Sequence, residues 1–210
     1  KLILASLALS FVIGCANGPR QESTGAAQTK DQATDSDESE VRKRARLRLE
    51  LALGCHYRVV VPGVQVSFPE VNIGLIPGGG GTQRMPRVLP LEMALQMITS
   101  GASVASDKLF KVPGQKLFDR LVEGDLLPGA LAFAQEVAAV RPMPLVRDLA
   151  VPAPADADLF NKARAEQAKL RKGLVSPQRC IDAVEVATQM DLDAGIDREL
   201  EIFKDIMVGP

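Results

Sequence analysis

Residues Leu49 to Arg87, LELALGCHYRVVVPGVQVSFPEVNIGLIPGGGGTQRMPR, contain two glutamates twenty positions apart in apolar surroundings. Glu50 lies within a run of leucine and alanine, and Glu70 follows Phe68-Pro69 and precedes a valine. Burial raises the pKa of a carboxyl group, so such a side chain can hold or take a proton near neutral pH. Two carboxylates in one apolar cleft suit acid/base chemistry, with one ionised and one protonated. The ordinary alternative is an exposed glutamate and a helix cap.

Two β-rich runs lie between these glutamates. Tyr57 to Val61 and Val64 to Phe68 are separated by Pro62-Gly63, which is a turn signal. We expect Glu50 to open a helix that leads into the first run and Glu70 to follow the second. This order predicts that the two carboxylates meet at one end of a sheet.

Pro77 to Thr82, with the sequence PGGGGT, forms a glycine-rich turn before a predicted helix. The turn lacks the Gly-Lys-Ser/Thr ending of a P-loop and the glycine spacing of a dinucleotide fingerprint. We therefore exclude binding of nucleotide phosphates by this turn.

Together these motifs resemble the crotonase (enoyl-CoA hydratase/isomerase) superfamily. GCHYRV and PEVNIGLIPGGGGTQRMPR are similar to the hydratase part of the multifunctional fatty-acid oxidation enzymes, where it is joined to a 3-hydroxyacyl-CoA dehydrogenase. The resemblance implies a lyase of β-oxidation that adds water reversibly across a trans-2-enoyl-CoA, with isomerisation of a double bond as an alternative. By this resemblance Glu50 orients and activates water, Glu70 exchanges a proton with the substrate α-carbon, and Gly78 lines the acyl site.

The residues before Glu50 depart from the family pattern. Crotonases carry consecutive glycines there, whose matches in this chain are Arg46, Leu47 and Arg48. The backbone N–H of Leu47 matches the donor to the thioester oxygen, and side chains at these positions hinder the close approach that glycine permits. Residues 1–48 do not resemble the upstream half of the family, which supplies the second oxyanion donor and much of the coenzyme A pocket. Because losing one such donor costs roughly 100- to 1000-fold in rate, a non-catalytic or defective fragment is the alternative reading.

Residues 1–15 are predicted to be a lipoprotein-like signal segment. Leu2 to Ile13 is apolar apart from two serines, and Val12-Ile13-Gly14-Cys15 resembles a lipobox in which Cys15 would be lipidated. The alternatives are a buried helix, which the following polar tract disfavours, and a fused or displaced reading frame. A genuine leader would make the chain a membrane-anchored lipoprotein, whereas the family resemblance predicts a cytoplasmic enzyme.

Residues 16–45 are predicted to be a disordered polar tether, since they bury too little apolar surface to offset the entropy of ordering. Five basic residues follow between Arg42 and Arg48, and they favour a solvated face over a binding patch. The chain as a whole is 46% hydrophobic and 24% charged with a net charge of −1. This balance predicts a globular protein and gives no sign of a nucleic-acid partner.

The expected fold class is α/β, with the C-terminal half of a crotonase-like (ββα-superhelix) domain over 46–141 and a proline-rich linker with helices over 142–210. A loop is expected at Lys111-Val112-Pro113. Ser176-Pro177 predicts an N-cap followed by the first residue of a helix. Leu200, Phe203 and Met207 are predicted to be the packed face of the last helix. Helices are expected over Leu91 to Thr99 before Gly101, Gly129 to Val140, Leu159 to Lys172 before Gly173, Gln178 to Gln189 and Ile196 to Met207.

The predicted partner is an acyl-CoA substrate, and no separate cofactor is expected, because coenzyme A enters as part of that substrate. No GxGxxG motif indicates an NAD site, and no cysteine or histidine spacing suggests a metal. His56 is interpreted as structural, and Cys55 and Cys180 as free buried thiols. Since crotonases are commonly trimers, the resemblance leaves a homo-oligomer open.

Overall fold

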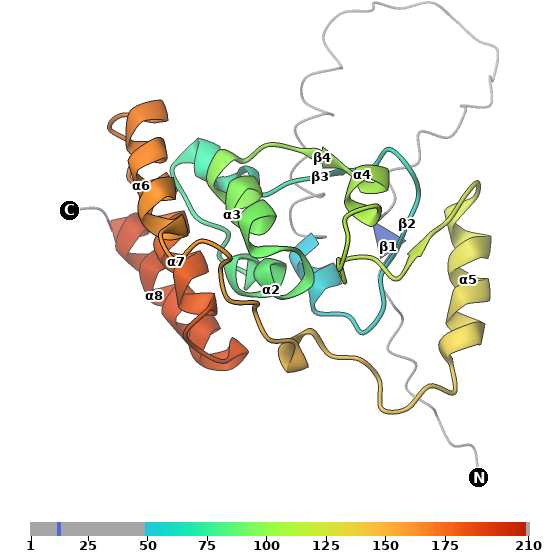
Figure 1. Ribbon diagram of the computed structural model, residues 1–210. Helices are drawn as coiled ribbons and strands as arrows, with labels where there is room; N and C mark the ends of the chain where they lie inside the picture. The colour runs from blue at the N-terminus through green and yellow to red at the C-terminus, as the bar shows by residue number, and fades with distance from the viewer. Residues whose placement is uncertain (1–11, 14–48, 209–210) are drawn as a thin grey trace, which may run out of the picture.

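The computed structural model describes residues 12–13 and 49–208 (Figure 1). The predicted leader up to residue 11, Cys15, the polar tether, the basic run and Leu47 lie outside the described residues. Val12–Ile13, the end of the predicted leader, form the short strand β1. Within the described residues, no helix combines the length and apolar character that crossing a bilayer requires.

After a first helical segment at residues 49–53, short strands and helices are mixed up to residue 121, and the described elements beyond it are helices. The strands that follow are β2 (Val59–Val60), β3 (Gln65–Val66), β4 (Val104–Ala105) and β5 (Arg120–Leu121). The helices are η1 (Pro69–Ile73), α2 (Gly81–Val88), α3 (Leu91–Ser100), α4 (Ser106–Phe110), α5 (Leu126–Val137), η2 (Val146–Asp148), α6 (Leu159–Leu170), α7 (Ser176–Ala187) and α8 (Leu192–Val208).

The described strands form two small sheets. β2 lies between β1 and β5, and both pairings are parallel. β3 pairs antiparallel with β4, where Val66 faces Val104. The two β-rich runs therefore lie where the sequence predicted them, but in different sheets. The prediction of a single sheet is wrong, because β3 finds its partner after α3 rather than in its neighbour along the chain.

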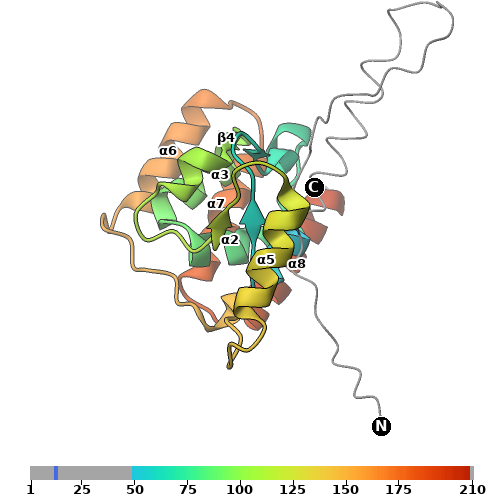
Figure 2. The same ribbon diagram turned by 90° about the vertical axis from the view of Figure 1, so that its right-hand side faces the viewer.

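Figure 1 shows α6, α7 and α8 at one end of the described structure and α5 at the other, with α2 and α3 between them. In Figure 2, α5 runs in front of β2. The linker after α5 returns along the outside of the structure past η2 to α6 (Figure 1). The arrangement is a mostly helical α/β fold with small sheets.

α7 occupies the centre of the helical part. It packs against α2, α3, α6 and α8, and Cys180, Ile181, Ala183 and Val184 on it are fully buried. The same hydrophobic core contains Leu53 near Glu50 and Val71 next to Glu70. Burial of apolar surface at about 25 cal/mol per Å² is the main favourable term in folding. A single core thus joins α6, α7 and α8 to the stretch that carries both predicted catalytic residues.

Most helices lie close to where the sequence predicts them. α3 ends at Gly101, whose φ of 66° is favourable for glycine and disfavoured for other residues. α5 begins three residues before the predicted Gly129 and ends at Val137, and α6 ends two residues before the predicted Lys172. The expected interruption at Lys111-Val112-Pro113 is confirmed, since α4 ends at Phe110. Both Cys55 and Cys180 are free thiols, but only Cys180 is buried.

Two predictions about α7 and α8 are wrong. Ser176 does not cap α7; its hydroxyl donates a hydrogen bond to the carbonyl of Val71 at 3.1 Å, which ties α7 to η1. Of the predicted packed face of α8, Leu200 is 41% exposed and Met207 61% exposed. The face of α8 that packs inward instead includes Gly195, Glu199 and Ile202, with Phe203 partly buried.

Arg58 joins the start of β2 to the segment before β5. Its side chain is buried, and its guanidinium donates hydrogen bonds to the carbonyls of Cys55, Lys116 and Leu117 at 2.6, 3.0 and 2.7 Å. Asp119 accepts from the backbone N–H of Arg58 at 2.6 Å. Burial lowers the pKa of Arg58 and raises the pKa of Asp119, and each charge opposes the effect on the other.

We predict that Arg58→Met lowers the free energy of unfolding by about 3 kcal/mol or more, because three carbonyls lose their donor and the half-buried Asp119 loses its ion-pair partner. Arg147 is the matched control, since its ion pair with Asp193 is exposed. Arg147→Met is expected to cost at most about 1 kcal/mol. Chemical denaturation of both variants measures the difference, and equal losses would contradict the structural role given to Arg58.

Candidate active site

Glu50 lies against the glycine-rich turn. The helical segment at 49–53 buries Leu49, Ala52 and Leu53 and leaves Leu51 exposed, which places Glu50 at the edge of the core. The backbone N–H of Gly79 donates to Glu50 Oε1 at 2.9 Å. Burial raises the pKa of Glu50, while the N–H groups of Gly79 and Gly81 and the charge of Arg84 oppose this rise. Glu50 is therefore a partly buried carboxyl with an increased affinity for protons.

The close contact with Glu50 explains why this turn is glycine-rich. A Cβ on Gly79 would lie 2.5 Å from Glu50 Oε2, and a Cβ on Gly81 would lie 2.9 Å from Glu50 Oε1. Gly80 has a φ of 87°, in the left-handed region that other residues avoid. The turn thus holds its backbone against a carboxylate, as the N-terminus of a helix favours.

A second carboxylate reaches the same turn from the far end of the described chain. Glu199 on α8 accepts hydrogen bonds from the N–H groups of Gly80 and Thr82 at 2.6 and 3.0 Å, and from the hydroxyl of Thr82. Glu199 is only 1% exposed. Burial, and to a lesser extent the charge of Glu50, raise its pKa to about 7 against the opposing effect of these donors.

The sequence analysis missed Glu199. It lies on a stripe of α8 at every fourth residue, with Gly195 against the side chain of Gln83 and the ring of Phe203 against Gly78. Apolar periodicity favoured the stripe through Leu200 and Met207 instead. The available signal was Gly195, because a glycine inside a helix indicates close packing when it is not a cap.

Glu70 lies in η1, between the buried Phe68 and Val71. Cys180 on α7 is within electrostatic range of both Glu70 and Glu199, whose charges add to the effect of burial in raising the pKa of its thiol. The structure thus links Glu50 to Glu199 through the turn. Direct convergence of Glu50 and Glu70 on one substrate stays a prediction.

Gly78 lies beside the aromatic ring of Phe203. A Cβ on Gly78 would lie 2.7 Å from the ring carbon Cδ2 of Phe203, so α8 packs directly on the glycine that the family resemblance assigns to the acyl site.

Among the described residues, no group of three or more histidine, cysteine, aspartate or glutamate side chains could hold a metal ion.

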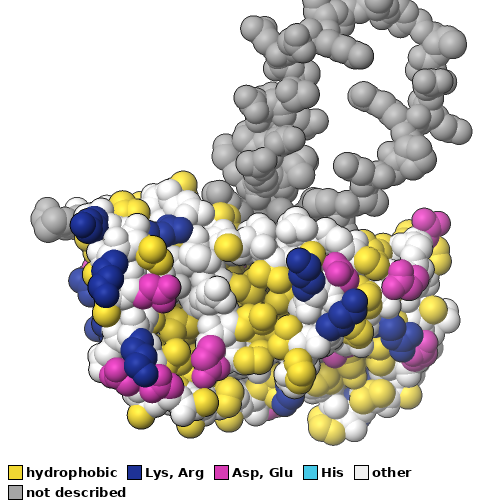
Figure 3. Space-filling view, turned by 45° about the horizontal axis from the view of Figure 1, so that its top comes forward, with side chains coloured by type: hydrophobic (Ala, Val, Ile, Leu, Met, Phe, Trp, Pro, Cys, Tyr) yellow, Lys and Arg dark blue, Asp and Glu magenta, His cyan; other side chains and the backbone are white. Residues whose placement is uncertain are grey.

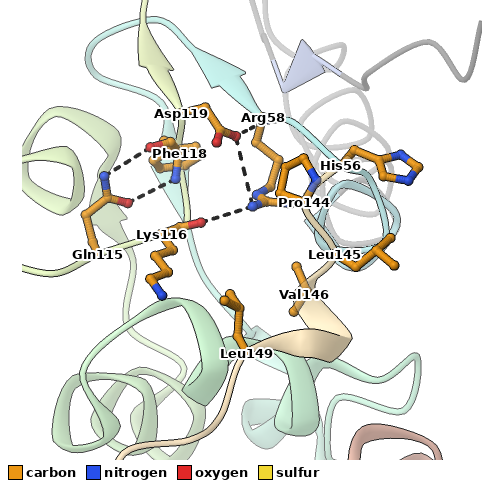
Figure 4. Close-up of a pocket in the computed structure, with 10 residues that line it drawn as sticks. All are labelled: His56, Arg58, Gln115, Lys116, Phe118, Asp119, Pro144, Leu145, Val146 and Leu149. Carbon is orange, nitrogen blue, oxygen red and sulfur yellow. Dashed lines mark hydrogen bonds and ion pairs between the residues drawn. The ribbon is translucent and has the colours of Figure 1, made fainter. Parts of the chain in front are cut away.

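A separate pocket of about 220 Å³ lies near Arg58, between the start of β2 and the linker (Figure 4). Figure 4 shows Lys116 on one side of it and His56, Leu145 and Val146 on the other. Figure 4 shows that the guanidinium of Arg58 donates a hydrogen bond to the carbonyl of Lys116 and forms an ion pair with Asp119. The Arg58 guanidinium and the Asp119 carboxylate in the lining are therefore already engaged in structural interactions.

No family model matches the chain. It is 36% identical over 158 residues to the peroxisomal bifunctional enzyme of Homo sapiens. The aligned region covers 74% of this chain and 21% of that protein. It is 34% identical over 168 residues to the peroxisomal fatty acid beta-oxidation multifunctional protein of Oryza sativa subsp. japonica, covering 77% of this chain and 23% of that protein. The chain thus spans about a fifth of the length of the curated relatives it matches.

The fold matches a carnitinyl-CoA dehydratase from Mycobacterium thermoresistibile with a TM-score of 0.52 at 19% identity, over 77% of this chain and 54% of that one. The structure therefore has part of a crotonase-like α/β fold. The chain belongs to the crotonase (enoyl-CoA hydratase/isomerase) superfamily and is homologous to the multifunctional β-oxidation proteins. Both relatives are named as peroxisomal proteins. The comparison therefore does not support the cytoplasmic location that the resemblance predicted.

We predict that the stability of the protein falls between pH 5 and 8, in part through Glu199. A carboxyl group whose folded pKa of about 7 exceeds its unfolded value of 4.5 binds more protons in the folded state. Its contribution is complete below the unfolded pKa and is lost as the pH rises through the folded pKa. That loss amounts to about 3 kcal/mol.

Glu199→Gln keeps the shape of the side chain without a titrating proton, so its free energy of unfolding should change less over this range. Glu201→Gln is the control, because Glu201 is on the same helix in an exposed ion pair with Arg198. Chemical denaturation at pH 5 and at pH 8 measures how much the free energy of unfolding of each variant changes. Parallel falls in the wild type and Glu199→Gln would contradict the assignment.

Proposed function

We propose that this chain carries an enoyl-CoA hydratase site, which adds water reversibly across the double bond of a trans-2-enoyl-CoA in fatty-acid β-oxidation. The observation that carries the proposal is the contact of Glu50 with the Gly79 N–H in a turn of the family sequence. The similarity to the multifunctional β-oxidation proteins supports the same substrate class. We further propose that residues 46–141 form the hydratase part and residues 142–210 its linker and helices.

Glu50 is proposed to orient and activate the attacking water. A general base works best when its pKa lies near the operating pH. Burial moves the pKa of Glu50 upward in that direction, while the Gly79 N–H keeps one carboxylate oxygen in place. The second oxygen is then the one that would receive the proton of the water.

Glu70 is proposed to exchange a proton with the substrate α-carbon. Pro69 begins η1, and the carbonyl of Glu70 accepts from the N–H of Leu75 at 3.0 Å, so the backbone at Glu70 is held firmly. Gly78 is proposed to line the acyl site and Leu47 to offer the oxyanion N–H. The same two carboxylates could shift a double bond, which makes 3-enoyl-CoA the second substrate to assay.

We predict that purified protein hydrates crotonyl-CoA, and that Glu50→Gln and Glu70→Gln each lower kcat about 100-fold or more, since positioned acid/base groups contribute about 10²- to 10⁴-fold. Loss of the conjugated enoyl thioester absorbance measures the rate. Glu123→Gln is the control, because Glu123 is exposed and distant in sequence from the turn.

Turnover that survives both substitutions would reject the mechanism. An inactive parent protein would reject a competent hydratase and favour a non-catalytic chain. Faster conversion of 3-enoyl-CoA than hydration of crotonyl-CoA would identify the activity as isomerisation. Each of these outcomes leaves the family membership intact.

A further inference from the structure

The peptide unit between Gly79 and Gly80 is held at both ends. Its N–H, on Gly80, donates to Glu199 at 2.6 Å, and its carbonyl, on Gly79, accepts from the guanidinium of Arg84 at 2.7 Å. A peptide unit is planar and rigid, so two opposed hydrogen bonds set its orientation. Glycine on both sides would otherwise leave this plane free to rotate.

The neighbouring peptide unit supplies the N–H of Gly79 that reaches Glu50. Because the two planes meet at the α-carbon of Gly79, the orientation of one limits where the other can point. Glu50 also lies within electrostatic range of Glu199. Glu199 is therefore placed to act on Glu50 through the backbone of the turn as well as through charge.

Docking of α8 does not itself require a buried carboxylate. Ile202 is buried in the hydrophobic core, Phe203 packs on it, and Gly195 allows α8 to approach Gln83 closely. A buried carboxyl is costly unless it is fully hydrogen-bonded, and a hydrophobic residue of similar size would serve packing better. Glu199 accepts three hydrogen bonds, and all three donors belong to Gly80 and Thr82 of the turn.

We propose that Glu199 is a positioning residue for Glu50: it orients the Gly79–Thr82 turn so that the Gly79 N–H holds the Glu50 carboxylate. The importance of this role for catalysis rests on the proposed hydratase function. The geometric claim does not, because it concerns only the turn and can be measured without substrate.

Amide hydrogen exchange of the ¹⁵N-labelled protein, followed by NMR at one pH, tests the proposal. Glu199→Ala is expected to speed exchange of the Gly79 N–H about ten- to a hundredfold, the effect of losing hydrogen bonds that hold a turn. Glu199→Gln, which keeps one oxygen acceptor, should give a smaller increase. Arg84→Met removes the donor to the carbonyl of the same peptide unit, so it should also speed exchange of the Gly79 N–H. Glu201→Gln, on the exposed side of α8, should leave this exchange unchanged.

The amides of α8 and α3 separate positioning from simple loss of structure. The proposal requires their exchange to stay slow while Gly79 speeds up. It is overturned if Gly79 exchange is unchanged in Glu199→Ala, or if the whole of α8 speeds up in parallel, which would show that Glu199 only holds the helix.

Hydration of crotonyl-CoA adds a separate readout. Glu199→Ala is expected to lower kcat while KM changes little, with partial rescue in Glu199→Gln. A parent protein without hydratase activity would reject the proposed function, and the exchange result would still decide the role of Glu199. An active protein whose kcat is unaffected by Glu199→Ala would overturn the proposed link to Glu50.

Discussion

The start of α2 brings a partly buried carboxylate, Glu50, and a buried one, Glu199, to one run of backbone amides. The amides of Gly79 and Gly81 act on Glu50, and those of Gly80 and Thr82 donate to Glu199. Amides at a helix N-terminus lack partners within the helix, and the helix dipole favours negative charge there. This arrangement compensates two desolvated acids, and it ties residues near position 50 to residues near position 200 through a glycine-rich turn.

The same arrangement sets the chemical character of the site. Burial raises the pKa of both acids, and together with the charge of Glu50 it brings the pKa of Glu199 to about 7, so Glu199 exchanges protons near neutral pH. An acid that can change its protonation state is what reversible hydration of an enoyl thioester requires. Membership of the crotonase superfamily and the proposed roles of Glu50 and Glu70 are consistent with this character. Figure 3 shows hydrophobic side chains near the middle of one face of the molecule, with charged side chains to either side of them.

Local signals in the sequence predicted local structure well. Gly101 marks the end of α3, the prolines after α5 mark a linker, and the two β-rich runs contain β2 and β3. These features depend on backbone conformation and short-range periodicity, which a single sequence records. The predictions were wrong where a residue distant in the sequence determines the local structure. β3 pairs with β4 across η1, α2 and α3, and the Ser176 hydroxyl reaches Val71 instead of capping its own helix.

By itself, the sequence determined the family, the α/β class, the glycine-rich turn and Glu50 and Glu70 as candidate catalytic acids, because these lie in one contiguous motif with recognisable spacing. Only the tertiary structure revealed Glu199. Apolar periodicity along α8 indicates a buried face through Leu200 and Met207, yet both are exposed. The orientation of a helix is decided by the surface it meets, and here that surface is a turn of glycines whose N–H groups need an acceptor.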